Sequence, residues 1–253
     1  MQDGSLIPLF GRARRDPSLA VLEGLHPLKH ALRFGCRPEM ILTPDLAELD
    51  RLAALLAPDL REQLATGARE IDAGVFAELA PLAPSTGVIA LAERPAVDVA
   101  AVLADRRAAP IVLLEDPRDL GNMGACVRVA AAADAAGVLS TGGHDPWHPD
   151  ALRGGAGLQF ALPVARVPAE VVLATGERPL LALDPEGEPL RAAELDGRAI
   201  LAFGTERHGL SGELLERADA RISIPMRAGV SSLNLATSVA AVLFAWRLAA
   251  PAP

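Results

Sequence analysis

The 253-residue sequence contains no tyrosine, a single lysine (Lys29) and two cysteines. Cys36 and Cys126 stand far apart, and neither has a second cysteine nearby, so the sequence predicts neither a disulfide framework nor a zinc site. The scarcity of lysine and tyrosine indicates a coding bias and not a function. Arginine supplies nearly all of the basic charge and suits the recognition of phosphate groups.

The sequence also lacks long hydrophobic runs. None approaches the roughly 18 to 20 uninterrupted apolar residues of a membrane span, and the first residues, with Asp3 and Pro8, lack the apolar core of a signal peptide. We therefore expect a cytoplasmic location. Hydrophobic residues make up 51% of the sequence and charged residues 22%, which is typical of a folded soluble protein.

An excess of basic charge is missing as well. The net charge of −8 counts against a nucleic-acid-binding protein, because proteins that neutralise phosphates normally have a basic surface. The charge is unevenly distributed, however, since residues 1–37 contain six lysine and arginine residues and three acidic ones. A basic N-terminal surface on an acidic protein is compatible with RNA binding.

No metal site is expected. The pairs His26/His30 and His144/His148 have the i,i+4 spacing of a helical metal site. The second pair lies among prolines that exclude a helix, and no pair of carboxylates accompanies either one. We therefore interpret all four histidines as residues without a metal.

Two α/β domains joined by a linker are predicted. Residues 1–95 combine helical patterns with short apolar runs and form a small α/β domain, whereas the charged, alanine-rich residues 96–107 form the linker. The helix over 46–64 contains Pro58, which is a possible break. The elements expected in the first domain are a helix over 21–34, a strand over 40–42, the helix over 46–64 and a strand over 88–91.

In residues 108–253, apolar strands alternate with helices, which predicts a mostly parallel sheet with helices on both faces. The last helix, expected over 233–248, is apolar nearly all round and must be buried on more than one side. A subunit interface would bury it, so we expect a homodimer. The other elements expected are strands over 111–114, 138–139, 162–167, 180–183, 200–203 and 222–224, and a helix over 123–136.

Three turns at the ends of apolar strands are candidates for chemistry, because ligands of open α/β sheets bind at the carboxyl ends of the strands. In the first turn, Asn122 stands at the start of a helix and Arg128 follows six residues later. Alternatively, Asn122 caps the helix and Arg128 is an ordinary solvated residue. Met123 and Cys126 occupy positions where a dinucleotide fingerprint needs glycine, which argues against an NAD-dependent oxidoreductase.

The second turn places Glu206 between Gly204 and Gly209, directly after the strand 200–203. A carboxylate there could bind a ligand, because glycine lets the backbone approach closely, or it could cap the helix that begins near Ser211. The third segment is Ile222 to Met226, followed by Ser231 to Asn234. Its serines could line a site or cap the last helix.

Together the three segments resemble the motifs of the SpoU/TrmH family, the SPOUT-class RNA 2′-O-ribose methyltransferases. Their order and spacing are those of the family. The first motif, N-x-G-x-x-x-R, is met by Asn122, Gly124 and Arg128; the second, G-x-E-x-x-G, by Gly204, Glu206 and Gly209; the third by Ile224-Pro225-Met226 and Ser232-Leu233-Asn234. Residues 153–157 resemble the family's R-x-S-x-G segment with glycine in place of serine, which leaves the role of this loop open.

The N-terminal half resembles the substrate-binding domain of the family through Val21-Leu22-Glu23-Gly24-Leu25-His26 and Thr86-Gly87-Val88-Ile89-Ala90. The resemblance thus covers about residues 16–249. It implies a C-terminal trefoil knot, S-adenosylmethionine as cofactor and a homodimer formed by the C-terminal domain. Ribosomal RNA is the expected substrate; the alternatives are transfer RNA and a non-catalytic RNA-binding or assembly protein of the same fold.

The resemblance also assigns site residues. It implies cofactor binding by Phe203, Gly204, Glu206, Ile224, Pro225, Met226, Ser232, Leu233 and Asn234, and catalysis by Asn122, Arg128, Glu206, Ser232 and Asn234. An arginine guanidinium is almost never neutral at pH 7, so a phosphate-clamping role for Arg128 is at least as plausible as a base role. For RNA contact we nominate Arg12, Arg14, Arg15, His26 and Arg33 together with Arg128, although each N-terminal residue could be a solvated charge.

Overall fold

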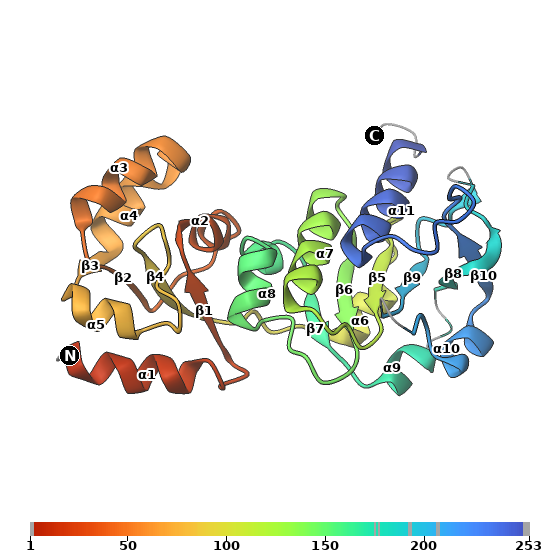
Figure 1. The fold of residues 1–253 in the computed structure, drawn as a ribbon, viewed down its shortest axis with the longest axis horizontal. Helices are drawn as coiled ribbons and strands as arrows, with labels where there is room; N and C mark the ends of the chain where they lie inside the picture. Colours follow the sequence, from red (N-terminus) through yellow and green to blue (C-terminus); the bar gives the residue numbers. More distant parts are fainter. Residues whose placement is uncertain (1–2, 175, 177, 192–193, 206–207, 250–253) are drawn as a thin grey trace. The chain divides into compact units, whose positions relative to one another are not determined.

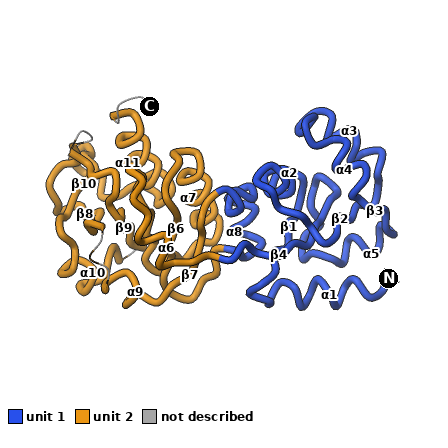
Figure 2. Tube along the Cα trace, turned by 180° about the vertical axis from the view of Figure 1, so that it is seen from behind, with its two compact units in different colours: residues 1–96, 147–161 blue, residues 97–146, 162–253 orange. Residues whose placement is uncertain are grey.

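The computed structural model describes residues 3–174, 176, 178–191, 194–205 and 208–249. The chain forms two compact units (Figure 2). Unit 1 comprises Met1–Ala96 and Trp147–Ala161, and unit 2 comprises Val97–Pro146 and Leu162–Pro253. Within the described residues, no helix is long and apolar enough to cross a membrane, and no group of three His, Cys, Asp or Glu side chains could hold a metal ion.

Unit 1 is built on a four-stranded sheet in the order β1 (Leu19–Glu23), β4 (Ile89–Glu93), β2 (Met40–Thr43), β3 (Ala68–Glu70). Strand β4 is antiparallel to both of its neighbours, whereas β2 and β3 are parallel. The hydrophobic core of unit 1 consists of apolar residues of this sheet packed with Leu6 and Phe10. The helices of the unit are α1 (Leu6–Ala13), α2 (Leu25–Arg33), α3 (Leu46–Leu56), α4 (Arg61–Gly67), α5 (Ala73–Glu78) and α8 (Pro149–Gly154).

One predicted helix of unit 1 begins later than expected. Val21 fits helical spacing, but it lies in β1 opposite Leu91, where it is buried. Gly24 has a φ of 105° and separates the strand from α2. The expected break at Pro58 is confirmed, because α3 ends at Leu56 and a short 3₁₀ helix (Pro58–Leu60) precedes α4.

Unit 2 contains a six-stranded, wholly parallel sheet flanked by helices, which confirms the predicted fold class (Figure 1). All strands of the expected sheet are present, and only their bounds differ. The strand order is β10 (Ala220–Ser223), β8 (Leu180–Pro189), β9 (Ile200–Phe203), β5 (Ile111–Leu114), β6 (Gly137–Ser140), β7 (Val164–Arg166). The helices are α6 (Val99–Ala104), α7 (Leu120–Ala132), α9 (Ala169–Leu173), α10 (Gly212–Arg217) and α11 (Leu235–Ala249).

Helix α7 begins and ends earlier than the expected 123–136. Asp119 caps its N-terminus by accepting a hydrogen bond from the backbone N–H of Asn122 at 2.6 Å. Asp134, with a φ of 60°, adopts the left-handed conformation that terminates a helix. The helix packs alongside α11, which buries Leu235, Val239, Val242, Leu243 and Trp246 (Figure 1).

A buried arginine ties three chain segments of unit 2 together. Arg178 is 1% exposed, and its guanidinium donates hydrogen bonds to the backbone carbonyls of Leu103, Asp105, Ala109 and Arg198. Burial lowers the pKa of Arg178 from its ordinary value. The four carbonyl dipoles stabilise the buried guanidinium charge. Arg178 thereby fixes the loops that lead into the sheet.

Candidate functional site

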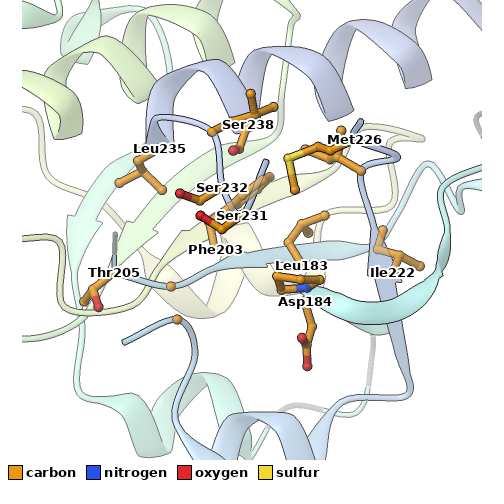
Figure 3. A pocket seen from close by; sticks show the side chains of 15 residues that line it. Leu183, Asp184, Phe203, Thr205, Ile222, Met226, Ser231, Ser232, Leu235 and Ser238 are labelled. Atoms are coloured by element: carbon orange, nitrogen blue, oxygen red, sulfur yellow. The ribbon is translucent and has the colours of Figure 1, made fainter. Parts of the chain in front are cut away.

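A pocket of about 390 Å³ opens at the carboxyl ends of β9 and β10 and beside the middle of β8 (Figure 3). Its wall combines apolar side chains with three serine hydroxyls, which suits a ligand with both apolar and polar parts. The lining residues are Leu183, Asp184, Pro185, Phe203, Gly204, Thr205, Gly209, Ile222, Ile224, Met226, Ser231, Ser232, Leu233, Leu235 and Ser238.

The glycine turn after β9 forms one wall of this pocket. Thr205 and Gly209 exchange two backbone hydrogen bonds, of 3.1 and 3.0 Å, which fold the chain back on itself. A Cβ atom on Gly204 would overlap the backbone of Gly209, so only glycine fits there. Both glycines of the second motif line the pocket, whereas Glu206 lies outside the described residues.

The third motif forms the opposite wall of the pocket. Ile224, Met226, Ser232 and Leu233 line the pocket, while Pro225 is exposed and is not among the lining residues. Ser231 and Ser232 line the pocket and lie outside the last helix, which begins at Leu235. The first N–H groups of that helix donate to the side chain of Asn234, so the alternative that Ser231 and Ser232 cap the helix is wrong.

Asn234 joins this loop to helix α7. Its side-chain oxygen accepts hydrogen bonds from the backbone N–H groups of Ala236 at 3.0 Å and Thr237 at 3.3 Å, which caps α11. Its amide nitrogen donates to Oδ1 of Asn122 at 3.0 Å. Because Asp119 caps α7, the alternative that Asn122 is the cap is wrong. The structure thus joins the first and third motifs beside the pocket, although neither asparagine is among the residues that line it.

Arg128 does not line the pocket. It is exposed on α7, and its side chain forms no hydrogen bond or ion pair with any other residue that the structure describes. Arg128 follows Asn122 by six positions in the helix, which corresponds to about 9 Å along the axis and roughly 240° around it. The side chain of Asn122 faces Asn234 in the loop 231–234. The side chains of Asn122 and Arg128 therefore leave α7 in different directions.

Several lining residues were missed by sequence reasoning. Leu183, Asp184 and Pro185 belong to β8, which lies between β9 and β10 in the sheet. The carboxylate of Asp184 accepts a hydrogen bond from the backbone N–H of Glu186 at 3.0 Å and lies 3.7 Å from Arg221. The apolar run 180–183 marked the strand, but its place in the sheet order was not visible in the sequence.

The residues nominated for RNA contact fall into two groups in unit 1. Arg12, Arg15 and His26 are exposed, as nucleic-acid contacts must be. Arg14 instead pairs with Glu23 at 2.6 Å, and Arg33 forms two hydrogen bonds with Asp59, of 2.9 and 2.8 Å. The hydrogen bond from Arg33 lowers the pKa of Asp59. Two of the six nominated cations are therefore already partnered by carboxylates.

The fold and the pocket define an α/β ligand-binding protein whose ligand lies at the carboxyl ends of parallel strands. Residues 109–244 match the model of the SpoU rRNA Methylase family. The chain belongs to this family. The N-terminal half is outside that match, but the relatives below extend through it.

An uncharacterized tRNA/rRNA methyltransferase of Mycobacterium tuberculosis is 33% identical, and the alignment covers 90% of this chain and 80% of that protein. The 23S rRNA (adenosine(1067)-2′-O)-methyltransferase of Streptomyces laurentii is 29% identical, with 88% and 83% covered. Among solved structures, the SpoU methyltransferase AviRb of Streptomyces viridochromogenes in complex with AdoMet superposes with a TM-score of 0.77, 25% identity and coverage of 98% and 97%.

Proposed function

We propose that the protein methylates ribosomal RNA, in preference to transfer RNA. As a SpoU family member, the chain is an RNA 2′-O-ribose methyltransferase that uses S-adenosylmethionine. Ribosomal RNA is favoured by the family description and by the 23S rRNA enzyme of S. laurentii, which aligns with 88% of this chain. Transfer RNA is the second candidate, because the mycobacterial relative carries both RNAs in its name.

The observation that carries the proposed mode of cofactor binding is the pocket. Its volume of about 390 Å³ lies within the range of small-molecule sites, and loops of the second and third motifs form it. The backbone of residues 203–205 and 224–226 would hold the adenosine, and the close packing of Gly204 against Gly209 would shape this wall of the site. The hydroxyls of Ser231, Ser232 and Ser238 would meet the polar end of the cofactor. When bound there, S-adenosylmethionine supplies the methyl group from its sulfonium.

The chain's own residues have to orient the acceptor. An in-line displacement requires the 2′-oxygen about 3 Å from the methyl carbon and a way for its proton to leave. Arg128 would hold an RNA phosphate and stabilise charge that develops on the 2′-oxygen. Asn122, Glu206, Ser232 and Asn234 would order the loops around it.

Replacing Arg128 tests this role. We expect Arg128→Ala to lower kcat at least a hundredfold, because removing one electrostatic donor from a transition state costs about that much. Arg128→Lys should retain part of the activity if simple charge is what matters, and none if the forked guanidinium or a base is required. Methyl transfer is measured with tritiated S-adenosylmethionine; unchanged activity in both variants would remove Arg128 from the site.

A homodimer through α11 is part of the proposal. Phe244 is 39% exposed and Leu248 83% exposed on this helix, and Leu233 in front of it is 37% exposed. Arg128, exposed on the neighbouring α7, could then complete the partner's pocket, which explains why it does not line its own. Sedimentation should show a dimer, and mixing Arg128→Ala with an inactive pocket variant should restore activity; a fully active monomer would contradict this arrangement.

Isothermal titration with S-adenosylmethionine tests the assignment of the pocket as the cofactor site. We expect one site per chain. Methyl transfer to unmodified transcripts of 23S ribosomal RNA and to a transfer RNA pool then distinguishes the two substrates. A folded protein whose cofactor affinity is unchanged by substitutions in the pocket would contradict the assignment. The roles of residues 1–95 as RNA-binding domain and of 108–253 as catalytic domain remain parts of this proposal.

A further inference from the structure

The segment that resembles the family's R-x-S-x-G motif does not line the cofactor pocket. It lies between β6 and β7 of the parallel sheet in sequence, but residues Trp147–Ala161 pack as part of unit 1 (Figure 2). The chain therefore passes between the units three times, at 96/97, 146/147 and 161/162. A stretch of the methyltransferase half thus belongs to the unit proposed to recognise RNA.

A buried carboxylate holds the middle of this segment. The Glu23 side chain is 3% exposed and forms ion pairs with Arg14 and Arg153, both at 2.6 Å. The second terminal nitrogen of Arg153 lies 2.9 Å from Asp150, one turn earlier in α8. A buried carboxylate is tolerated only when it is paired, so β1 and α8 depend on each other through these contacts.

Backbone contacts reinforce the ion pairs. Gly157 has a φ of 76°, and a Cβ atom there would overlap the backbone of Pro27 at the start of α2. Nδ1 of His30 lies 2.7 Å from the carbonyl oxygen of Ala156 and donates a hydrogen bond to it. The role left open by the sequence is thus a packing role against β1 and α2, for which glycine at position 157 is required.

Aromatic contacts hold the start of the segment and join its end to its start. The guanidinium of Arg94, just after β4, lies 5.9 Å from the centre of the Trp147 ring. The rings of Trp147 and Phe160 meet edge to face with centroids 5.0 Å apart. The start and the middle of the segment thus contact other parts of unit 1, and Phe160 closes the segment onto Trp147.

We propose that Glu23 and Arg153 are positioning residues for methyl transfer. They hold segment 147–161 in unit 1. This shortens the length of flexible chain between the RNA-recognition unit and the parallel sheet. This inference rests on the proposed function. With the segment released, the crossings at 146/147 and 161/162 would be joined by a flexible loop, and bound RNA would meet the cofactor less often in a reactive geometry.

The variant Arg153→Met tests the inference with little risk to folding, because Glu23 keeps its ion pair with Arg14. We expect faster backbone hydrogen exchange across 147–161 and a fall in kcat of about tenfold or more. The dissociation constants for S-adenosylmethionine and for a 23S ribosomal RNA transcript should stay within about threefold of wild type. Arg153→Lys, which can still reach Glu23, should recover much of kcat. Arg61→Met, which breaks the exposed pair with Asp50 in the same unit, is the matched control and should change nothing.

Three outcomes would overturn the inference. Unchanged exchange across 147–161 would show that Arg153 does not hold the segment. Weaker RNA binding at constant kcat would make Arg153 an RNA contact, and weaker cofactor binding would place the loop in the cofactor site. Hydrogen exchange needs neither RNA nor cofactor, so it decides the anchoring even if the wild-type protein methylates neither RNA and the proposed function fails.

Discussion

Two asparagines that are 112 positions apart share one hydrogen bond beside the pocket. Asn234 is the donor to Asn122, and its oxygen caps α11 at the same time. One amide thus fixes the loop 231–234 beside the pocket with both of its polar atoms. At the scale of single residues, the site depends on such contacts between motifs as much as on the atoms that line it.

The direction of this hydrogen bond can be tested by paired substitutions. Asn234→Asp keeps the capping oxygen but removes the donor, whereas Asn122→Asp keeps the acceptor. We expect the first to weaken S-adenosylmethionine binding about tenfold, the effect of about 1.4 kcal/mol, and the second to weaken it less, because it keeps the acceptor for Asn234. Titration calorimetry measures both. Equal losses would contradict the assigned direction.

Gly204 provides a second test at this scale. The Cβ of Gly204→Ala would overlap the Gly209 backbone, so the turn has to open at a cost of about 1 to 3 kcal/mol, and cofactor affinity should fall with it. Gly212→Ala is the control, because a Cβ there has no neighbour within 4 Å. The prediction fails if thermal unfolding and cofactor titration treat the two variants alike.

At the scale of elements, Arg178 connects the end of α6 with the segments that enter β5 and β9. Arg178→Met would leave four carbonyls without their donor inside the fold. We expect a loss of about 3 kcal/mol or more and a melting temperature lower by several degrees. Arg191→Met, which breaks only an exposed pair with Glu194, should leave thermal unfolding unchanged; a similar loss there would point to a general effect of arginine removal.

At the scale of the whole molecule, a chain with a net charge of −8 must meet an anionic substrate. Arg12 and Arg15 form no ion pair with the residues that the structure describes, so they are better placed for this than Arg33, which Asp59 already neutralises. RNA affinity of the double variant Arg12→Gln/Arg15→Gln should depend less on salt, with the slope of log K against log salt smaller by about 1 to 2. Arg33→Gln should change the slope of log K against log salt less. Filter binding at several salt concentrations measures both slopes, and equal changes would refute the assignment.

Local patterns in the sequence determined the parallel sheet, most of its strands and the residues of the three motifs, because apolar runs, breaks at Pro58 and glycine turns act over a few residues. Only the tertiary structure decided that β8 lies beside β9 and β10 and brings Leu183 to the pocket, that Asn122 meets Asn234, and that residues 147–161 pack in unit 1. Each of these depends on segments distant in sequence, whose pairing is selected by the packing and charge balance of the folded chain. Glu23 shows the reason most directly, since a buried carboxylate needs a partner that its neighbours in the sequence do not supply.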